Sequence, residues 1–230
     1  MEFRASRASS WVLASLLLLL VLFPVLEEMA RPVLFIAVVA GVFLGGVAAV
    51  KPGGRHVRTA VILAVIQMAL AGIAAALSED SAGYRVVAGL GLASIAVLIV
   101  YSIFCVLRYV LLATRITRDQ IYAGISAYLM LGFAFGCVYF LMNTLDPGGF
   151  AVNTAKLPAT PDLMYFSFVT LTTLGYGDIT PVGKAARALV ELEAVSGMIY
   201  IAVFMARLVS LHSGGRDSTG VSAPDKPDST

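Results

Sequence analysis

One short run of residues has the types and the spacing needed to bind a dehydrated monovalent cation. It is Thr172-Thr173-Leu174-Gly175-Tyr176-Gly177-Asp178. Backbone carbonyl oxygens can replace the water around such an ion only when successive carbonyls point the same way. That arrangement forces alternate residues into conformations that side chains resist and that glycine tolerates. Gly175 and Gly177 therefore predict a strand with a row of inward-facing oxygens.

The expected ligands of the ion are oxygens of four consecutive residues. Thr173 adds its hydroxyl below the carbonyls of Leu174, Gly175 and Tyr176. The Tyr176 ring is expected to point away from the ion and to brace the strand. One chain carries one such strand, and non-helical backbone at membrane depth must line a wet cavity or be buried in protein. The site is therefore expected to close only in an oligomer.

The composition places the chain in a membrane. Of its 230 residues, 59% are hydrophobic and 13% are charged, and the mean hydropathy is +0.90. These values exclude a soluble globular domain. Cys105 and Cys137 lie within apolar segments, so neither a disulfide nor a metal site is expected from them.

Six apolar segments approach or exceed the bilayer-spanning length of about 20 residues. The sequence predicts an all-α integral membrane protein with six transmembrane helices. For the first segment, which follows Arg4 and Arg7, a cleaved secretory signal is the alternative interpretation. The segments are Trp11–Leu26, Pro32–Val50, Thr59–Leu77, Val86–Leu112, Ile121–Met142 and Ala185–Leu211.

A further helix is predicted at Asp162–Thr173, which is too short to cross the membrane at about 1.5 Å per residue. Pro161 and Asp162 suit its start, because proline tolerates the first turn and a carboxylate stabilises the positive end of a helix. We therefore expect a re-entrant pore helix that leads into the run of oxygens.

The stretch from Tyr165 to Pro181 resembles the pore helix, selectivity filter and exit loop of the potassium channel family. Leu174 stands where the family usually has Val or Ile, which leaves the carbonyl unchanged. The resemblance implies a homotetramer that binds K⁺ as the permeant ion, with no other cofactor. It implies K⁺ at Thr173, Leu174, Gly175 and Tyr176, with Gly177 completing the filter.

Three regions follow from this resemblance. Residues 119–212 form the pore module of outer helix, pore helix, filter and inner helix. Residues 1–118 form a four-helix transmembrane region without voltage-sensor charges, because the fourth segment holds only Arg108 and a sensor needs several gating charges. Residues 213–230 are predicted to be a disordered cytoplasmic tail. The tail is too short for an attached regulatory domain, which leaves a separate regulatory subunit open.

Four residues are expected to support the filter, namely Thr172, Asp178, Tyr165 and Glu193. Val169 stands where some members of the family have a Glu that holds the Asp after the filter. The Tyr165 hydroxyl, or a group of a neighbouring subunit, is expected to restrain Asp178 instead. Glu193 is costly in an apolar helix and is expected to hydrogen-bond the pore helix or support its loop, with proton sensing as the alternative.

Gly197 lies near the middle of the last apolar segment, where the family's inner helix often bends. A gating hinge is one interpretation and close helix packing is the other, since glycine is common in membrane helices.

Lys and Arg positions predict the orientation, because cytoplasmic loops are enriched in them. Six spans with both termini in the cytoplasm place most basic residues inside and the Asp178 end of the filter outside. The expected location is a bacterial plasma membrane, in contact with lipid.

The sequence therefore predicts passive, potassium-selective flux through a tetrameric pore. It shows no arrangement typical of an enzyme and no nucleic-acid-binding pattern. A poorly selective cation channel, a subunit of a potassium transporter and a non-conducting partner of another channel are the alternatives.

Overall fold

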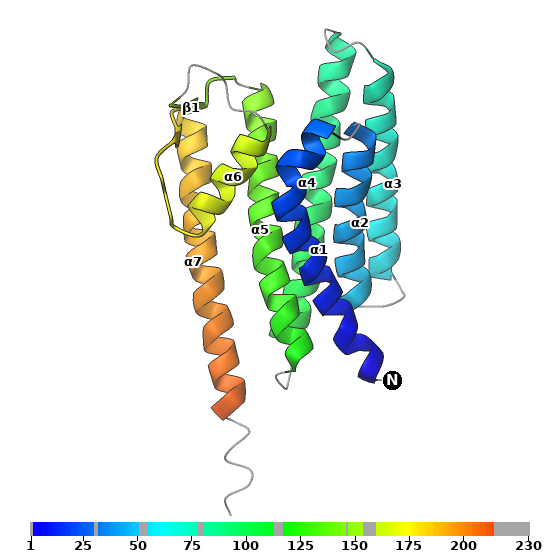
Figure 1. Ribbon diagram of the computed structural model, residues 1–230, viewed down its shortest axis with the longest axis vertical. Coiled ribbons are helices and arrows are strands. Elements are labelled where there is room, and N and C mark those ends of the chain that lie inside the picture. Colours follow the sequence, from blue (N-terminus) through cyan, green and yellow to red (C-terminus); the bar gives the residue numbers. More distant parts are fainter. Residues whose placement is uncertain are drawn as a thin grey trace, which may run out of the picture.

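The computed structural model is mostly helical (Figure 1). It describes residues 2–29, 32–50, 55–77, 81–112, 117–145, 147–153 and 160–213. The tail predicted at 213–230 lies outside the described residues except for Ser213, which ends the last helix. The helices are α1 (Glu2–Met29), α2 (Pro32–Val50), α3 (Arg55–Ala76), α4 (Ala82–Leu111), α5 (Arg118–Leu145), α6 (Thr160–Leu171) and α7 (Lys184–Ser213), and the strands are β1 (Phe150–Val152) and β2 (Ile179–Pro181).

Four of the described helices contain segments long and apolar enough to cross a membrane. These are Arg55–Ala74 in α3, Gly89–Leu111 in α4, Arg118–Leu145 in α5 and Lys184–Ser210 in α7. Helices α1 and α2 contain shorter apolar stretches, Ser9–Pro24 and Val39–Ala48. The prediction of a helical membrane protein is confirmed at this level.

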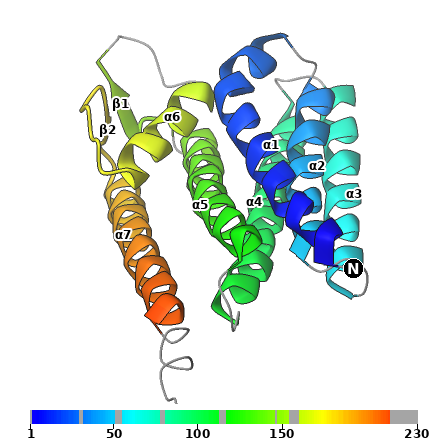
Figure 2. The same ribbon diagram turned by 60° about the horizontal axis from the view of Figure 1, so that its bottom comes forward.

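The helices form two groups that meet at α5. Helices α5 and α7 stand side by side with α6 tilted between their upper parts, and α1 to α4 lie on the other side of α5 (Figures 1 and 2). Helix α5 packs against both α4 and α1, so it joins the groups.

The short helix and the strands differ in detail from the sequence prediction. The pore helix was expected to end at Thr173, but α6 ends at Leu171 and Thr173 has a φ of 60°. A residue with that φ cannot continue a right-handed helix. Strands β1 and β2, which pair antiparallel with Phe150 opposite Pro181, were not predicted because three residues are too few to show an alternating pattern.

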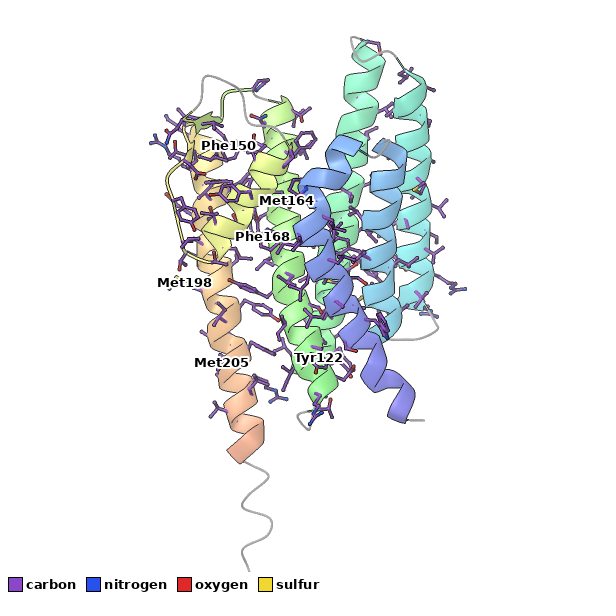
Figure 3. The ribbon with its side chains drawn as sticks, viewed as in Figure 1. Tyr122, Phe150, Met164, Phe168, Met198 and Met205 are labelled. Carbon is purple, nitrogen blue, oxygen red and sulfur yellow. The ribbon has the colours of Figure 1, made fainter. Side chains whose placement is uncertain are left out.

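Glycines of α5 let the neighbouring helices approach closely. A Cβ added at Gly132 would lie 2.7 Å from the Phe168 ring, and one added at Gly136 would lie 2.5 Å from the sulfur of Met164. Phe168 and Met164 both belong to α6 (Figure 3). At the other end of α5, a Cβ at Gly124 would lie 2.3 Å from the Phe204 ring of α7. The pore helix and α7 thus pack against bare backbone.

Phe133 of α5 links the two helix groups. Its ring centroid lies 6.3 Å from that of Phe23 in α1 and 6.1 Å from that of Phe43 in α2. The same ring makes an edge contact with Phe168 of α6, with the centroids 5.3 Å apart. Aromatic pairs of this kind add about 0.5–1.5 kcal/mol beyond area burial, so one side chain stabilises both groups.

We predict that Gly132→Ala destabilises the protein by about 1–3 kcal/mol, the usual penalty for overpacking a tight contact. The reason is the 2.7 Å approach of its Cβ to the Phe168 ring. Thermal unfolding of the purified protein in detergent measures the change. Gly72→Ala is the matched control, because Gly72 is exposed in α3 and its added Cβ meets nothing within 4 Å. Equal melting temperatures for the two variants would contradict the packing described.

Candidate functional site

Helix α6 positions the run of candidate ligands. It begins at Thr160-Pro161-Asp162, where proline and an acidic residue favour the first turn. Leu163, Phe166 and Leu171 are buried against the other helices. The side of α6 that carries Tyr165 is partly open, with 42% of that side chain exposed.

The chain reverses after α6 by hydrogen bonds to the carbonyl of Val169. The N–H groups of Leu174 and Gly175 donate to this oxygen at 2.9 and 3.3 Å. The last carbonyls of a helix have no partner within the helix, so this oxygen is free to accept both. The amides of the strand thereby face α6.

The backbone of residues 173–177 alternates in conformation. Thr173, Gly175 and Gly177 have φ angles of 60°, 55° and 77°, whereas the described residues between them have no positive φ. Glycine adopts such angles without penalty. For Thr173, which is β-branched, a positive φ is a strained conformation. The sequence reasoning assigned this geometry to the glycines and missed it at Thr173, although the spacing of two residues to Gly175 carried the signal.

Four consecutive carbonyl oxygens in this strand are free. Within the described part of the chain, those of Thr173, Leu174, Gly175 and Tyr176 accept no hydrogen bond. Backbone carbonyls that leave bulk water need a partner. Alternating φ angles turn successive carbonyls to one side of the strand, so these oxygens can coordinate a cation together.

The strand is anchored at its far end by Asn153, which directly follows β1. The backbone N–H of Asn153 donates to the carbonyl of Asp178 at 3.1 Å, and its side-chain Nδ2 lies 3.5 Å from the carbonyl of Gly177. Asp178 closes its own turn, because its Oδ1 accepts from the N–H of Ile179 at 3.1 Å. Asn153 was missed by sequence reasoning, since nothing in the sequence around it indicates the contact.

Tyr165 lies near enough to Asp178 to interact with it electrostatically. Desolvation and then the nearby Asp178 carboxylate raise the pKa of the Tyr165 hydroxyl. The restraint of Asp178 by the Tyr165 hydroxyl therefore stays a prediction.

Glu193 is fully buried where α7 faces α6 and α5. Its carboxyl group accepts a hydrogen bond from the Tyr139 hydroxyl of α5 and lies 2.5 Å from the Ser167 hydroxyl of α6. Ser167 also lies 2.8 Å from the carbonyl of Gly132. The expected contact of Glu193 with the pore helix is therefore present. Tyr139 and Ser167 were missed, and their only signal was a polar group within an apolar segment.

Gly197 lies against the end of α6. A Cβ added there would be 2.8 Å from Cδ1 and 3.1 Å from the carbonyl oxygen of Leu171. The same carbonyl accepts a hydrogen bond of 2.9 Å from the Tyr128 hydroxyl of α5. Close packing, one of the two interpretations of this glycine, is what the contacts favour.

The candidate site lies open in the single chain. Leu174 and Tyr176 are 55% and 66% exposed. Along α7, apolar side chains that include Met198 and Met205 are also exposed, and Figure 3 shows Met198 on the side of α7 away from α5. The Tyr176 ring is therefore not braced within its own chain. Thr172, the remaining support residue, donates its hydroxyl to the carbonyl of Phe168 at 2.7 Å.

The ion channel family matches this chain over residues 96–213, from the middle of α4 to the end of α7. Protein LctB of Geobacillus stearothermophilus is 34% identical over 104 residues, which are 41% of this chain and 74% of that protein. No solved structure matches.

Four relatives bear the name of potassium channels, and two of them illustrate the extent of the match. The inward rectifier potassium channel Kirbac3.1 of Paramagnetospirillum magnetotacticum is 40% identical over 55 residues, 24% of this chain and 19% of that protein. Two pore potassium channel c of Oryza sativa subsp. japonica is 32% identical over 84 residues, 36% of this chain and 17% of that protein. The matched part is thus a small share of either channel.

We predict that Tyr165→Phe loosens the segment after Gly177, because it removes the hydroxyl that is expected to donate to the nearby Asp178 carboxylate. Hydrogen exchange of the purified protein should become faster at the amide of Ile179, which bonds to the same carboxylate. Tyr122→Phe, on α5, is the control. Unchanged exchange in Tyr165→Phe would mean that Asp178 is restrained by other groups.

We predict that Gly197→Ala lowers the stability of the protein by about 1–3 kcal/mol through overpacking. The added methyl group meets the Leu171 side chain and carbonyl. Thermal unfolding compared with Ser196→Ala, one residue earlier on α7, isolates this contact. A stable Gly197→Ala protein would argue against packing and in favour of a hinge.

Proposed function

The chain belongs to the ion channel family and is a channel rather than an enzyme. On this premise we propose that it conducts K⁺ selectively and passively through a pore formed by four copies. The permeant ion exchanges its water for the carbonyls of Thr173, Leu174, Gly175 and Tyr176 and for the Thr173 hydroxyl. Gly177 completes the strand, and Asp178 marks its outer end.

One observation carries the proposal: the alternating φ angles of residues 173–177 together with the carbonyl oxygens of 173–176, which accept no hydrogen bond from the described residues. An extended strand would pair its carbonyls with a neighbouring strand on alternate sides. In this strand the N–H groups of Leu174 and Gly175 donate to the carbonyl of Val169, and the carbonyl oxygens of the strand lie in a row. Such a row binds an ion tightly enough for entry and, through several similar sites, weakly enough for exit.

The exposed surfaces support the tetramer. One chain supplies a single row of oxygens, and a dehydrated cation needs oxygens on all sides. The filter strand and the apolar side of α7 are open in the single chain, as expected of surfaces that meet copies of the same chain around an axis. A neighbouring chain then also braces the Tyr176 ring.

The proposed topology has six spans, with α1 and α2 as the first two and both termini in the cytoplasm of a bacterial cell. Residues 1–118 form the N-terminal region and residues 119–212 the pore module. In α4 the single described basic residue of the last turn is Arg108, and steep voltage dependence requires several charges in the field. We therefore propose a channel that is not steeply gated by voltage, with room for a separate regulatory subunit.

We predict that the purified protein in liposomes passes K⁺ in strong preference to Na⁺ and that barium blocks the flux. Gly177→Ala should reduce K⁺ flux about tenfold or more, because a left-handed conformation costs about 1–2 kcal/mol for each non-glycine residue and every subunit carries the change. An added Cβ at Gly177 meets nothing within 4 Å, so the loss reports backbone conformation. Gly72→Ala should conduct like the parent.

Three outcomes would count against this function. Equal K⁺ and Na⁺ flux would indicate a poorly selective channel. Absence of flux from a well-folded tetramer would indicate a non-conducting partner. A monomer or dimer in cross-linking would remove the shared axis on which the site depends.

A further inference from the structure

A cluster of polar groups behind the filter joins three helices. Glu193 of α7 is 0% exposed, Ser167 of α6 is 0% exposed and Tyr139 of α5 is 0% exposed. The hydroxyls of Tyr139 and Ser167 each contact one oxygen of the Glu193 carboxyl group, and Ser167 also reaches the backbone carbonyl of Gly132. The cluster lies in the apolar interior, where every polar hydrogen and lone pair needs a partner.

The number of hydrogens available decides the state of the cluster. The Ser167 hydroxyl has one hydrogen but two oxygens in reach, the carbonyl of Gly132 at 2.8 Å and Oε1 of Glu193 at 2.5 Å. A carbonyl can only accept. If Glu193 were ionised, Ser167 could serve one of these oxygens and would face the other without a proton between them.

A protonated Glu193 supplies the missing hydrogen. Tyr139 then donates to Oε2 of Glu193, and Oε1 of Glu193 donates to the Ser167 hydroxyl. Ser167 in turn donates to the carbonyl of Gly132. Each contact holds one hydrogen, and the chain runs in one direction from α5 through α7 and α6 back to α5.

The surroundings of Glu193 favour the neutral form for a second reason. Among the described residues no Lys, Arg or His forms an ion pair with Glu193, and no unprinted partner adds to its two hydroxyl contacts. The titratable groups that face it are Tyr139 and Tyr128, both of α5. An anion buried in the membrane without a cation is strongly disfavoured, whereas a hydrogen-bonded neutral acid is tolerated.

We propose that Glu193 is a neutral carboxylic acid whose proton is donated to Ser167, and that this relay of hydrogen bonds positions the pore helix from behind. Glu193 is thus a positioning residue, since it acts on the filter through α6. The effect on selectivity rests on the proposed channel function, but the proton itself does not.

The variant that tests the relay is Glu193→Gln. An amide keeps one acceptor for Tyr139 and gains a donor for Ser167, so it reproduces the neutral acid and lacks any charge. Glu193→Leu removes both contacts, and Ser167→Ala removes the link to Gly132 while leaving Glu193 in place. Glu191→Gln is the matched control, because Glu191 is exposed on the same helix.

Infrared absorption of the purified full-length protein at neutral pH should show the carbonyl band of a protonated carboxylic acid. The band should disappear in Glu193→Gln and persist in Glu191→Gln. In liposomes, Glu193→Gln should keep the K⁺ over Na⁺ flux ratio of the parent. Ser167→Ala and Glu193→Leu should lower that ratio about tenfold, as expected when a buried polar group loses its partner.

Several results would overturn the proposal. A parent spectrum without the band would mean that Glu193 is ionised. If Glu193→Gln lowered the K⁺ over Na⁺ flux ratio as much as Glu193→Leu does, selectivity would require the negative charge of Glu193. Parental selectivity in Ser167→Ala would show that the relay does not position the filter. If the parent itself shows no preference for K⁺, the proposed function fails, and the infrared band still decides the state of Glu193.

Discussion

The carbonyl oxygen of Val169 makes the interaction on which the rest of the site depends. It accepts hydrogen bonds from the N–H groups of Leu174 and Gly175 at the end of α6, where the last carbonyls of a helix have no partner within the helix. Because these two N–H groups point toward α6, the carbonyl oxygens of the strand lie on the side away from α6. The positive φ angles of Thr173, Gly175 and Gly177 then keep those oxygens in a row.

The position of α6 therefore sets the position of the oxygens, and α6 is fixed by contacts on several sides. Bare backbone at Gly132 and Gly136 lets its aromatic and methionine side chains pack closely. Tyr128 binds the carbonyl of Leu171 at its end, and Glu193 binds Ser167 near its middle. Because these contacts come from both α5 and α7, a shift of either long helix would displace α6.

Two hydrogen bonds join the C-terminal end of α4 to the pore region. The Tyr109 hydroxyl donates to the buried carboxylate of Asp119 in the first turn of α5 at 2.9 Å. Nη2 of Arg207, near the end of α7, donates to the carbonyl of Leu111 at 3.1 Å. A cation beside the negative end of a helix is stabilised there. Of the four front helices, α4 is thus joined by specific hydrogen bonds to both long helices of the pore region, in addition to the apolar contacts that Phe133 makes with α1 and α2.

The sequence by itself determined the local features of this protein. Long apolar runs specify membrane helices, the Pro161-Asp162 start specifies a short helix, and glycines two residues apart specify an alternating backbone, since each depends on neighbouring residues alone. Only the tertiary structure decided which distant groups meet. Glu193 lies 54 residues from Tyr139 and 26 from Ser167, and Asn153 meets Gly177 across a strand pair too short to predict. Gly197 became a packing contact because Leu171 lies against it. Such contacts depend on the distance and the angle at which the helices pack. No local sequence pattern specifies this distance or this angle.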